Sequence, residues 1–210
     1  MTAVQVKDDV RVVERALNKA RKTFNDKLTV PLQFRINQLL NLKKGMKTLE
    51  KDITEAIKKD LGRDYFATWF AEISMLDYEI DHTVSNLKKW AAGIDVSTPM
   101  FLGPACSRVT FEPLGVVCII GSWNFPLYTT VGPLIHAIAA GNCAVIKPSE
   151  ISCNSLFKIK ALITRWLDMN AFIAIEGAVE VAKTLTAQKF DLICFTGSTE
   201  KGRLVATAAA

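Results

Sequence analysis

The sequence lacks the cysteine spacing of zinc ribbons and of thioredoxin-type redox sites. Its 210 residues hold five Cys at irregular positions, and no C-x-x-C pair occurs. An odd, scattered set of thiols is typical of a reduced protein whose cysteines serve as small buried side chains. We therefore expect a cytoplasmic chain without a metal site.

Charge of one sign and a long hydrophobic run are also missing. The net charge of +5 comes from 26 Lys and Arg mixed with 21 Asp and Glu, which does not favour a nucleic-acid partner. The first thirty residues are too charged for a signal peptide. Residues 113–146 contain no charged Asp, Glu, Lys or Arg, but Pro and Gly interrupt them repeatedly, so we expect no membrane segment.

Motifs of other enzyme classes are absent. There is no G-x-S-x-G, which leaves an α/β-hydrolase unsupported. The two histidines, His82 and His136, are far apart in the sequence. Neither has the spacing to a cysteine that is typical of a metal site or a catalytic dyad.

The first half of the chain has the apolar period of helices. Apolar residues recur every three or four positions from Val6 to Phe24, again over 32–61, and again from Trp69 to Leu87. The first stripe also fits a coiled coil or a basic membrane-surface helix, but it is short and its charges are mixed, so packing within its own domain is favoured. We predict a helical region over 1–104 that ends in a connector at 97–104.

The second half alternates short apolar strands with helices. Strands are predicted at 115–120, 143–146, 171–175 and 192–195, with helices at 127–140, 151–167 and 178–188. Strands that are apolar on both faces and alternate with helices indicate a parallel sheet covered on both sides. Residues 105–210 are therefore predicted to form a doubly wound, Rossmann-like α/β region that binds its ligand at the carboxyl ends of the strands.

Polar residues follow the first two predicted strands. Asn124 stands just before a helix, where its amide would either stabilise an oxyanion or cap the helix. Lys147, Ser149 and Glu150 follow the second strand. Lys147 and Glu150 would bind ribose hydroxyls, or they would form an exposed ion pair beside a Ser149 helix cap.

The fourth predicted strand runs into a glycine-containing turn and a helix. Gly197 and Ser198 open this turn and Gly202 closes it, the context in which backbone N–H groups hold an anion. The G-x-x-x-x-G spacing is not followed by Lys and Ser or Thr, which disfavours a phosphoryl-transfer enzyme. A diphosphate fits the turn, and an ordinary capped turn is the alternative.

Together these segments resemble the aldehyde dehydrogenase superfamily. Five motifs occur in order: Glu-Pro-Leu-Gly-Val-Val at 112–117, Trp-Asn-Phe-Pro at 123–126, Ala-Ala-Gly-Asn at 139–142, Lys-Pro-Ser-Glu at 147–150 and Phe-Thr-Gly-Ser-Thr at 195–199. Trp-Ala-Ala at 90–92 and Val-Ser-Thr-Pro at 96–99 look most like the class 3 or fatty-aldehyde branch. The resemblance covers nearly the whole chain, and it is to the N-terminal portion of the family.

The resemblance implies NAD(P)-dependent oxidation of an aldehyde to a carboxylic acid. It assigns the oxyanion donor to Asn124 and cofactor contacts to a set of residues around it: Trp123, Lys147, Ser149, Glu150, Gly197, Ser198 and Gly202. A carboxylate at Glu150 would repel a 2′-phosphate, which favours NAD over NADP. Homodimers are typical of the family.

One departure from the family is large. None of the five Cys stands in the context of the family's nucleophile, and its general-base Glu and its later subunit-pairing segments are unmatched too. We therefore expect an N-terminal fragment without the catalytic domain that is inactive alone and exposes a sheet edge. The alternative is a non-catalytic module that binds a dinucleotide or pairs with a partner.

Overall fold

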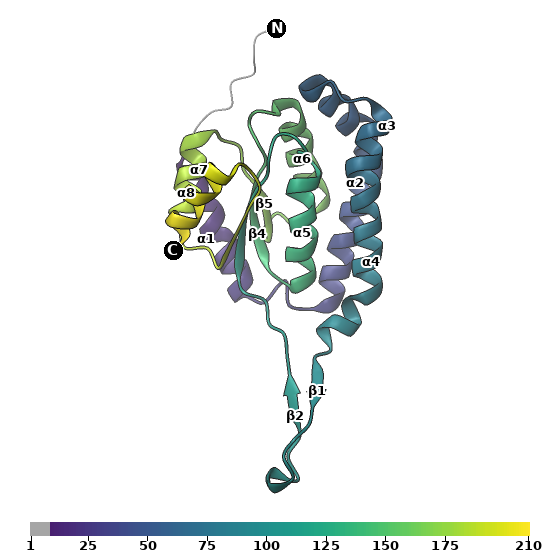
Figure 1. Ribbon diagram of the computed structural model, residues 1–210, viewed down its shortest axis with the longest axis vertical. Coiled ribbons are helices and arrows are strands. Elements are labelled where there is room, and N and C mark those ends of the chain that lie inside the picture. The colour runs from purple at the N-terminus through teal and green to yellow at the C-terminus, as the bar shows by residue number, and fades with distance from the viewer. Residues whose placement is uncertain (1–8) are drawn as a thin grey trace.

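A parallel four-stranded sheet forms the centre of the protein in a computed structural model that describes residues 9–210 (Figure 1). The strands are β3 (Val116–Ile120), β4 (Cys143–Lys147), β5 (Phe172–Ala174) and β6 (Leu192–Phe195), in the order β5-β4-β3-β6. Every residue of β3 and β4 is buried, which matches their uncharged sequences up to Lys147. The register pairs Ile120 with Lys147 and with Phe195, so the three strands end level with one another.

Helices cover both faces of this sheet. One face carries α5 (Tyr128–Ala140) and α6 (Cys153–Trp166), and the other carries α1 (Arg11–Asn25), α7 (Val179–Thr186) and α8 (Thr199–Ala209) (Figure 1). This arrangement confirms the predicted doubly wound α/β fold. At the end of α5, Gly141 adopts φ 86°, and Arg35 donates to the carbonyl of Ala139 in the last turn of that helix.

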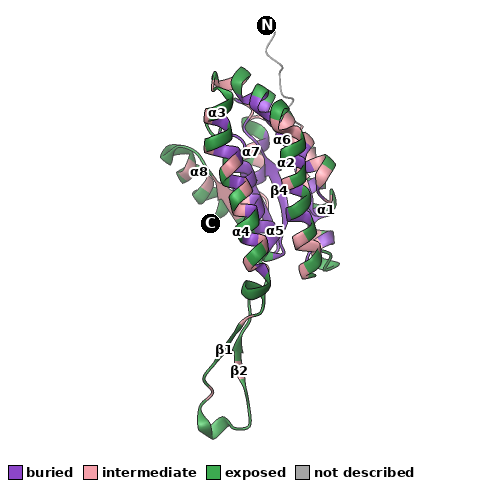
Figure 2. Ribbon diagram, turned by 90° about the vertical axis from the view of Figure 1, so that its right-hand side faces the viewer, coloured by how far each residue is buried: buried purple, intermediate pink, exposed green. Residues whose placement is uncertain are grey.

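A second layer of helices packs outside α5 and α6. It consists of α2 (Leu32–Leu61) and of a continuous helical segment built from α3 (Tyr65–Thr68), a π-helical turn η1 (Trp69–Ile73) and α4 (Ser74–Ala91). Their buried faces join the sheet in one hydrophobic core (Figure 2). Along α1, Val13, Leu17 and Ala20 are buried and the helix contacts β3 and β4, so the apolar stripe packs inside the protein, against the sheet of the predicted second region rather than against the other helices of 1–104. Val6 lies outside the described residues.

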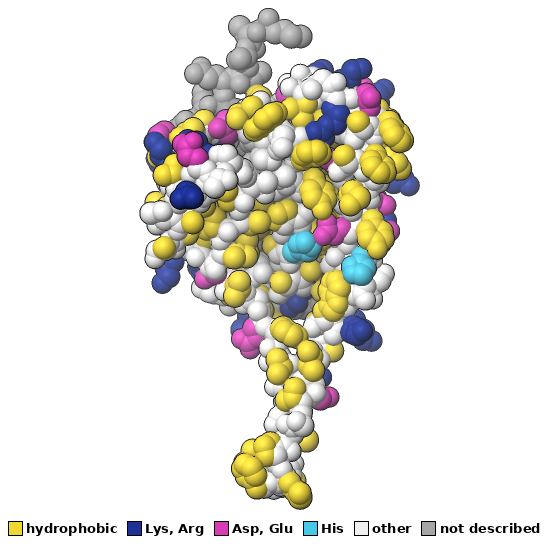
Figure 3. All heavy atoms as spheres, in the orientation of Figure 1, with side chains coloured by type: hydrophobic (Ala, Val, Ile, Leu, Met, Phe, Trp, Pro, Cys, Tyr) yellow, Lys and Arg dark blue, Asp and Glu magenta, His cyan; other side chains and the backbone are white. Residues whose placement is uncertain are grey.

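The predicted connector at 97–104 is part of a projecting hairpin. Strands β1 (Ile94–Val96) and β2 (Ser107–Val109) pair antiparallel, and a short 3-10 helix η2 (Met100–Leu102) lies between them. The sequence did not predict these strands because three residues are too few to show an alternating pattern. We call residues 94–109 the hairpin arm; it extends away from the body, and apolar side chains gather at its tip (Figures 1 and 3).

No helix within residues 9–210 is both long and apolar enough to cross a membrane.

The edge formed by β6 and α8 is the least covered part of the sheet. Leu192 in β6 is 46% exposed, and α8 contains no buried residue. We predict that amides of β6 and α8 exchange with solvent faster than those of β3 and β4 by at least about tenfold, because regions with few buried contacts open locally. Hydrogen–deuterium exchange of the 210-residue protein checks this. Equal protection of β6 and β3 would contradict it.

Candidate functional site

A cleft of about 960 Å³ opens at the carboxyl ends of β3, β4 and β6. The chain passes from β5 on one side of β4 to β6 on the far side of β3, so the strand order reverses here, the place where open α/β sheets bind ligands. Seven of the eight predicted site residues line this cleft: Trp123, Asn124, Lys147, Ser149, Glu150, Gly197 and Ser198. Three segments that are distant in sequence therefore meet at one site.

Lys147 lies on the inner wall of the cleft, where it is almost fully buried. Its side chain is 3% exposed, and its Nζ lies 2.7 Å from Oε2 of Glu150. The alternative of an exposed ion pair is therefore wrong for the lysine. Ser149 is not the N-cap residue of α6, which is Ser152; its Oγ accepts from the N–H of Ile151, and Asp60 of α2 accepts from the N–H groups of Asn154 and Ser155.

Ser198 begins α8 at the opposite wall. Its Oγ accepts a hydrogen bond from the N–H of Lys201 at 3.4 Å, so Ser198 caps the helix, and both Gly197 and Ser198 at this helix N-terminus line the cleft. Gly202 does not line the cleft; its N–H donates to the carbonyl of Ser198 inside the first turn. Apolar side chains of α7 and α8, among them Val179 and Leu204, complete this wall.

Trp123 and Asn124 form the turn between β3 and α5. Trp123 is 49% exposed to the cleft, and its carbonyl accepts from Oγ of Ser152. Asn124 does not cap α5, since that helix begins at Tyr128 without a side-chain cap from its own N-cap residue. Instead, Oδ1 of Asn124 accepts from Oγ of Ser122 at 2.7 Å.

A buried carboxylate that the sequence did not reveal caps α5. Glu72 of η1 is fully buried and accepts from the N–H groups of Leu127 and Tyr128 at 2.8 and 2.9 Å. It also pairs with Arg63, whose Nη2 donates to the carbonyl of Asn124. Burial raises the pKa of Glu72, while the hydrogen bonds and the charge of Arg63 act in the opposite direction. The apolar period of this segment predicts a helix but does not indicate a buried charge; the π-helical turn that carries Glu72 is seen only in the structure.

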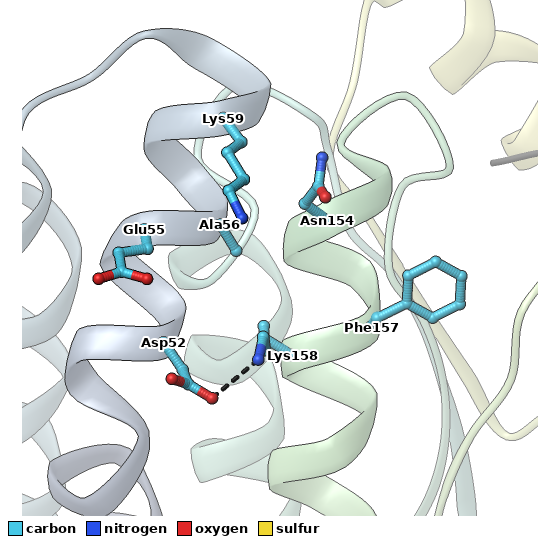
Figure 4. A pocket seen from close by; sticks show the side chains of 7 residues that line it. All are labelled: Asp52, Glu55, Ala56, Lys59, Asn154, Phe157 and Lys158. Atoms are coloured by element: carbon cyan, nitrogen blue, oxygen red, sulfur yellow. Dashed lines mark hydrogen bonds and ion pairs between the residues drawn. The ribbon is translucent and has the colours of Figure 1, made fainter. Parts of the chain in front are cut away.

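A smaller pocket of about 200 Å³ lies between α2 and α6 (Figure 4). Lys158 of α6 donates to Asp52 of α2 across it at 2.8 Å, and Lys59 and Glu55 bring further charge of both signs. Acidic and basic side chains both line this pocket, so it has no concentration of one charge that would bind a charged ligand, and we do not consider it a site comparable to the cleft. Within residues 9–210 no group of three or more His, Cys, Asp or Glu side chains could hold a metal ion.

A comparison with protein families matches residues 2–210 to the model of the aldehyde dehydrogenase family. The chain belongs to the aldehyde dehydrogenase family. It is 38% identical over 94% of its length to a dimeric NADP-preferring aldehyde dehydrogenase of Canis lupus familiaris, and 38% identical over 95% to 4,4′-diaponeurosporen-aldehyde dehydrogenase of Staphylococcus aureus. It is also 38% identical over 94% to aldehyde dehydrogenase family 3 member A2 of Pongo abelii.

The solved structures agree with this family. A substrate-bound aldehyde dehydrogenase of Staphylococcus aureus superposes with a TM-score of 0.92 at 39% identity, over 94% of this chain and 43% of that one. The chain spans 41 to 44% of the curated aldehyde dehydrogenases named above. The predicted resemblance to the class 3 branch and to the N-terminal portion of these proteins is confirmed.

The thiols of this aldehyde dehydrogenase chain lie away from the cleft. None of the five Cys lines it in the part of the chain that the structure describes. Burial raises the pKa of Cys118 to about 12 and that of Cys143 to about 11, from an ordinary value of 9.0. None of the five forms a disulfide within the described residues.

These values predict a defined response to pH. Thiols that stay protonated when folded but ionise near pH 9 when unfolded stabilise the fold fully below that pH. This stabilisation is lost as the pH rises towards 11 and 12, so the free energy of unfolding should fall over that window. At about pH 8, Ellman's reagent should label exposed Cys106 and leave Cys118 and Cys143 unlabelled until denaturant is added. Labelling of Cys118 as fast as of Cys106 would contradict the prediction.

Proposed function

We propose that this chain is the dinucleotide-binding part of an NAD(P)-dependent aldehyde dehydrogenase, an enzyme that oxidises an aldehyde to a carboxylic acid. The observation that supports this most is the convergence of Asn124, Lys147 and Ser198 on one cleft at the reversal of strand order. Lys147 reaches the cleft from β4, Ser198 from the turn after β6, and Asn124 from the turn after β3.

The chemistry of the lining matches the parts of a dinucleotide. The N-terminus of α8 at Gly197 and Ser198 offers N–H groups to a pyrophosphate. The Lys147–Glu150 pair offers a donor and an acceptor for ribose hydroxyls, and the apolar wall with Val179 and Leu204 would hold the adenine ring. The bound nicotinamide would supply the acceptor of a hydride.

NAD is the cofactor we propose, with NADP bound more weakly. A 2′-phosphate near the adenosine ribose would meet the carboxylate of Glu150, and Lys147 is already paired with that carboxylate. The name of the canine relative records a preference for NADP, so titration with both cofactors is part of the test.

Asn124 would serve the aldehyde end of the site. An amide donor beside the cleft stabilises the oxyanion that forms when a nucleophile attacks an aldehyde carbonyl. The attacking thiolate and the general base match no lining residue of the described chain, so the complete reaction needs groups that residues 9–210 do not supply. We propose that the protein is cytoplasmic, because its scattered cysteines are typical of a protein kept in the reduced state.

The division into a helical region, 1–104, and a dinucleotide-binding region, 105–210, remains our proposal. Helices α1, α2 and α4 of the first region share one core with the sheet of the second. The hairpin arm straddles the boundary between the two regions.

A partner-pairing role is the second candidate, and the hairpin arm favours it. Met100 and Phe101 of η2 are 95% and 86% exposed, and Val96 of β1 is exposed as well. Apolar side chains gather at the tip of the arm (Figure 3). Exposed apolar surface of this extent marks interaction sites. We propose a homodimer with the arm in its interface, in line with the word dimeric in the canine relative's name.

Titration with NAD, followed by tryptophan fluorescence, tests the proposed cofactor site. Quenching should saturate in the wild-type protein and be lost in Trp123→Phe, because Trp123 is the tryptophan that lines the cleft. Lys147→Met should raise the Kd by about tenfold or more, because it removes a charged hydrogen-bond donor from the ribose. Lys158→Met is the matched control: it removes a lysine that pairs with Asp52 outside the cleft and should leave the Kd unchanged. Absence of saturable NAD and NADP binding would exclude the proposed cofactor site.

Measurement of aldehyde turnover tests whether the described residues bind the cofactor without catalysing the oxidation. The 210-residue protein is expected to bind NAD but to form no NADH from aldehydes, because no thiol lines the cleft that would attack the carbonyl. Absorbance of NADH, followed with short- and long-chain aldehydes, checks this. Turnover that Asn124→Ala abolishes would show that the described residues suffice for catalysis.

A further inference from the structure

The side-chain amide of Asn124 is oriented by Ser122. The Ser122 hydroxyl donates to Oδ1 of Asn124 at 2.7 Å, and Ser122 is itself 8% exposed. The N–H of Ser122 donates to Oγ1 of Thr129 at 2.9 Å, and that hydroxyl donates to the carbonyl of Phe125, also at 2.9 Å. Because Oδ1 is engaged, Nδ2, the donor end of the amide, is the end that remains for a ligand in the cleft.

The main chain of Asn124 is held by Arg63. Nη2 of Arg63 donates to the carbonyl of Asn124 at 2.5 Å, and the guanidinium lies over the ring of Phe125, 4.5 Å from its centroid. Two successive residues of the turn are thus fixed by one planar cation. One guanidinium makes both contacts at once, because its N–H groups lie in the plane while its flat face covers the ring, a geometry that a lysine does not provide.

Glu72 ties this cation to the helix that follows the turn. Its Oε1 accepts from Arg63 at 2.5 Å, and its Oε2 accepts from the N–H groups of Leu127 and Tyr128. Glu72 is completely buried, so an unpaired carboxylate there would be strongly destabilising. If Arg63 moved away from the turn, the carboxylate of Glu72 would be left unpaired. The position of the Asn124 carbonyl is therefore coupled to the start of α5 through Arg63 and Glu72.

We propose that Ser122, Arg63 and Glu72 are positioning residues that present Asn124 to the cleft as a hydrogen-bond donor. The reversed amide would present an oxygen, which repels an oxyanion, whereas a donor that is fixed before the reaction costs no reorganisation when charge develops. The value of this arrangement for catalysis rests on the proposed function. The hydrogen bonds that make up the arrangement are formed without any ligand.

Ser122 gives the cleanest test, because its variants change one hydroxyl. In ¹⁵N-labelled protein the Asn124 side-chain amide is assigned by its loss in Asn124→Asp, and its order parameter is measured without ligand. We expect about 0.85 for wild type and for Ser122→Thr, which keeps the hydroxyl, and below about 0.6 for Ser122→Ala. Asn18, exposed on α1, is the mobile reference within the same spectrum. An unchanged order parameter in Ser122→Ala would overturn the role of Ser122.

Glu72→Gln tests the second half of the arrangement. The amide of Gln would place a donor against Arg63, so exchange of the Leu127 and Tyr128 N–H groups should rise at least about tenfold and the order of the Asn124 amide should fall. Glu79→Gln is the control, since Glu79 of α4 pairs with His136 at the surface. If Glu72→Gln does not fold, Arg63→Lys, which keeps a cation beside Glu72, is measured in the same way. Wild-type order of the Asn124 amide in a folded variant would overturn the proposal.

The two proposals fail separately. Absence of NAD binding with an ordered Asn124 amide would remove the proposed function and leave the positioning intact. Saturable NAD binding with a mobile Asn124 amide in the wild-type protein would do the reverse.

Discussion

The complete burial of β3 and β4 is the constraint on which the rest of the structure depends. Both strands lie between two layers of helices, so neither face tolerates a charge, and their residues are apolar until Lys147 ends β4. Polar chemistry is therefore displaced to the ends of the strands. Since parallel strands end at one edge, Asn124, Lys147 and Ser198 are brought to the same cleft.

Buried and half-buried polar contacts connect the outer helices to this edge. Glu72 reaches the N-terminus of α5, and Asp60 reaches that of α6 through the N–H and Oγ of Ser155. At the other end of α5, Arg35 donates to the carbonyl of Ala139. Each contact satisfies backbone groups that a helix end leaves unpaired. The N-terminal helices thus position the ends of α5 and α6 as well as covering the core.

The cleft shows how membership of a family and possession of its reaction differ. The described residues supply a helix N-terminus, a buried lysine paired with Glu150 and an amide at the strand ends. They supply no thiol at the same place. In the proposed function, cofactor binding and orientation therefore fall to the described residues, and the covalent step falls to groups that they do not supply.

The sequence by itself determined the parallel sheet, its helices and the convergence of its strand ends, because apolar period and uncharged runs report burial directly. It could not reveal the hairpin arm, whose strands are too short for a pattern, nor the burial of Glu72. Only the tertiary structure decided that Ser198 caps α8 while Asn124 caps nothing, and that Lys147 is buried. The physical reason is that the partner of a polar side chain is chosen by packing across distant segments, which no local spacing encodes.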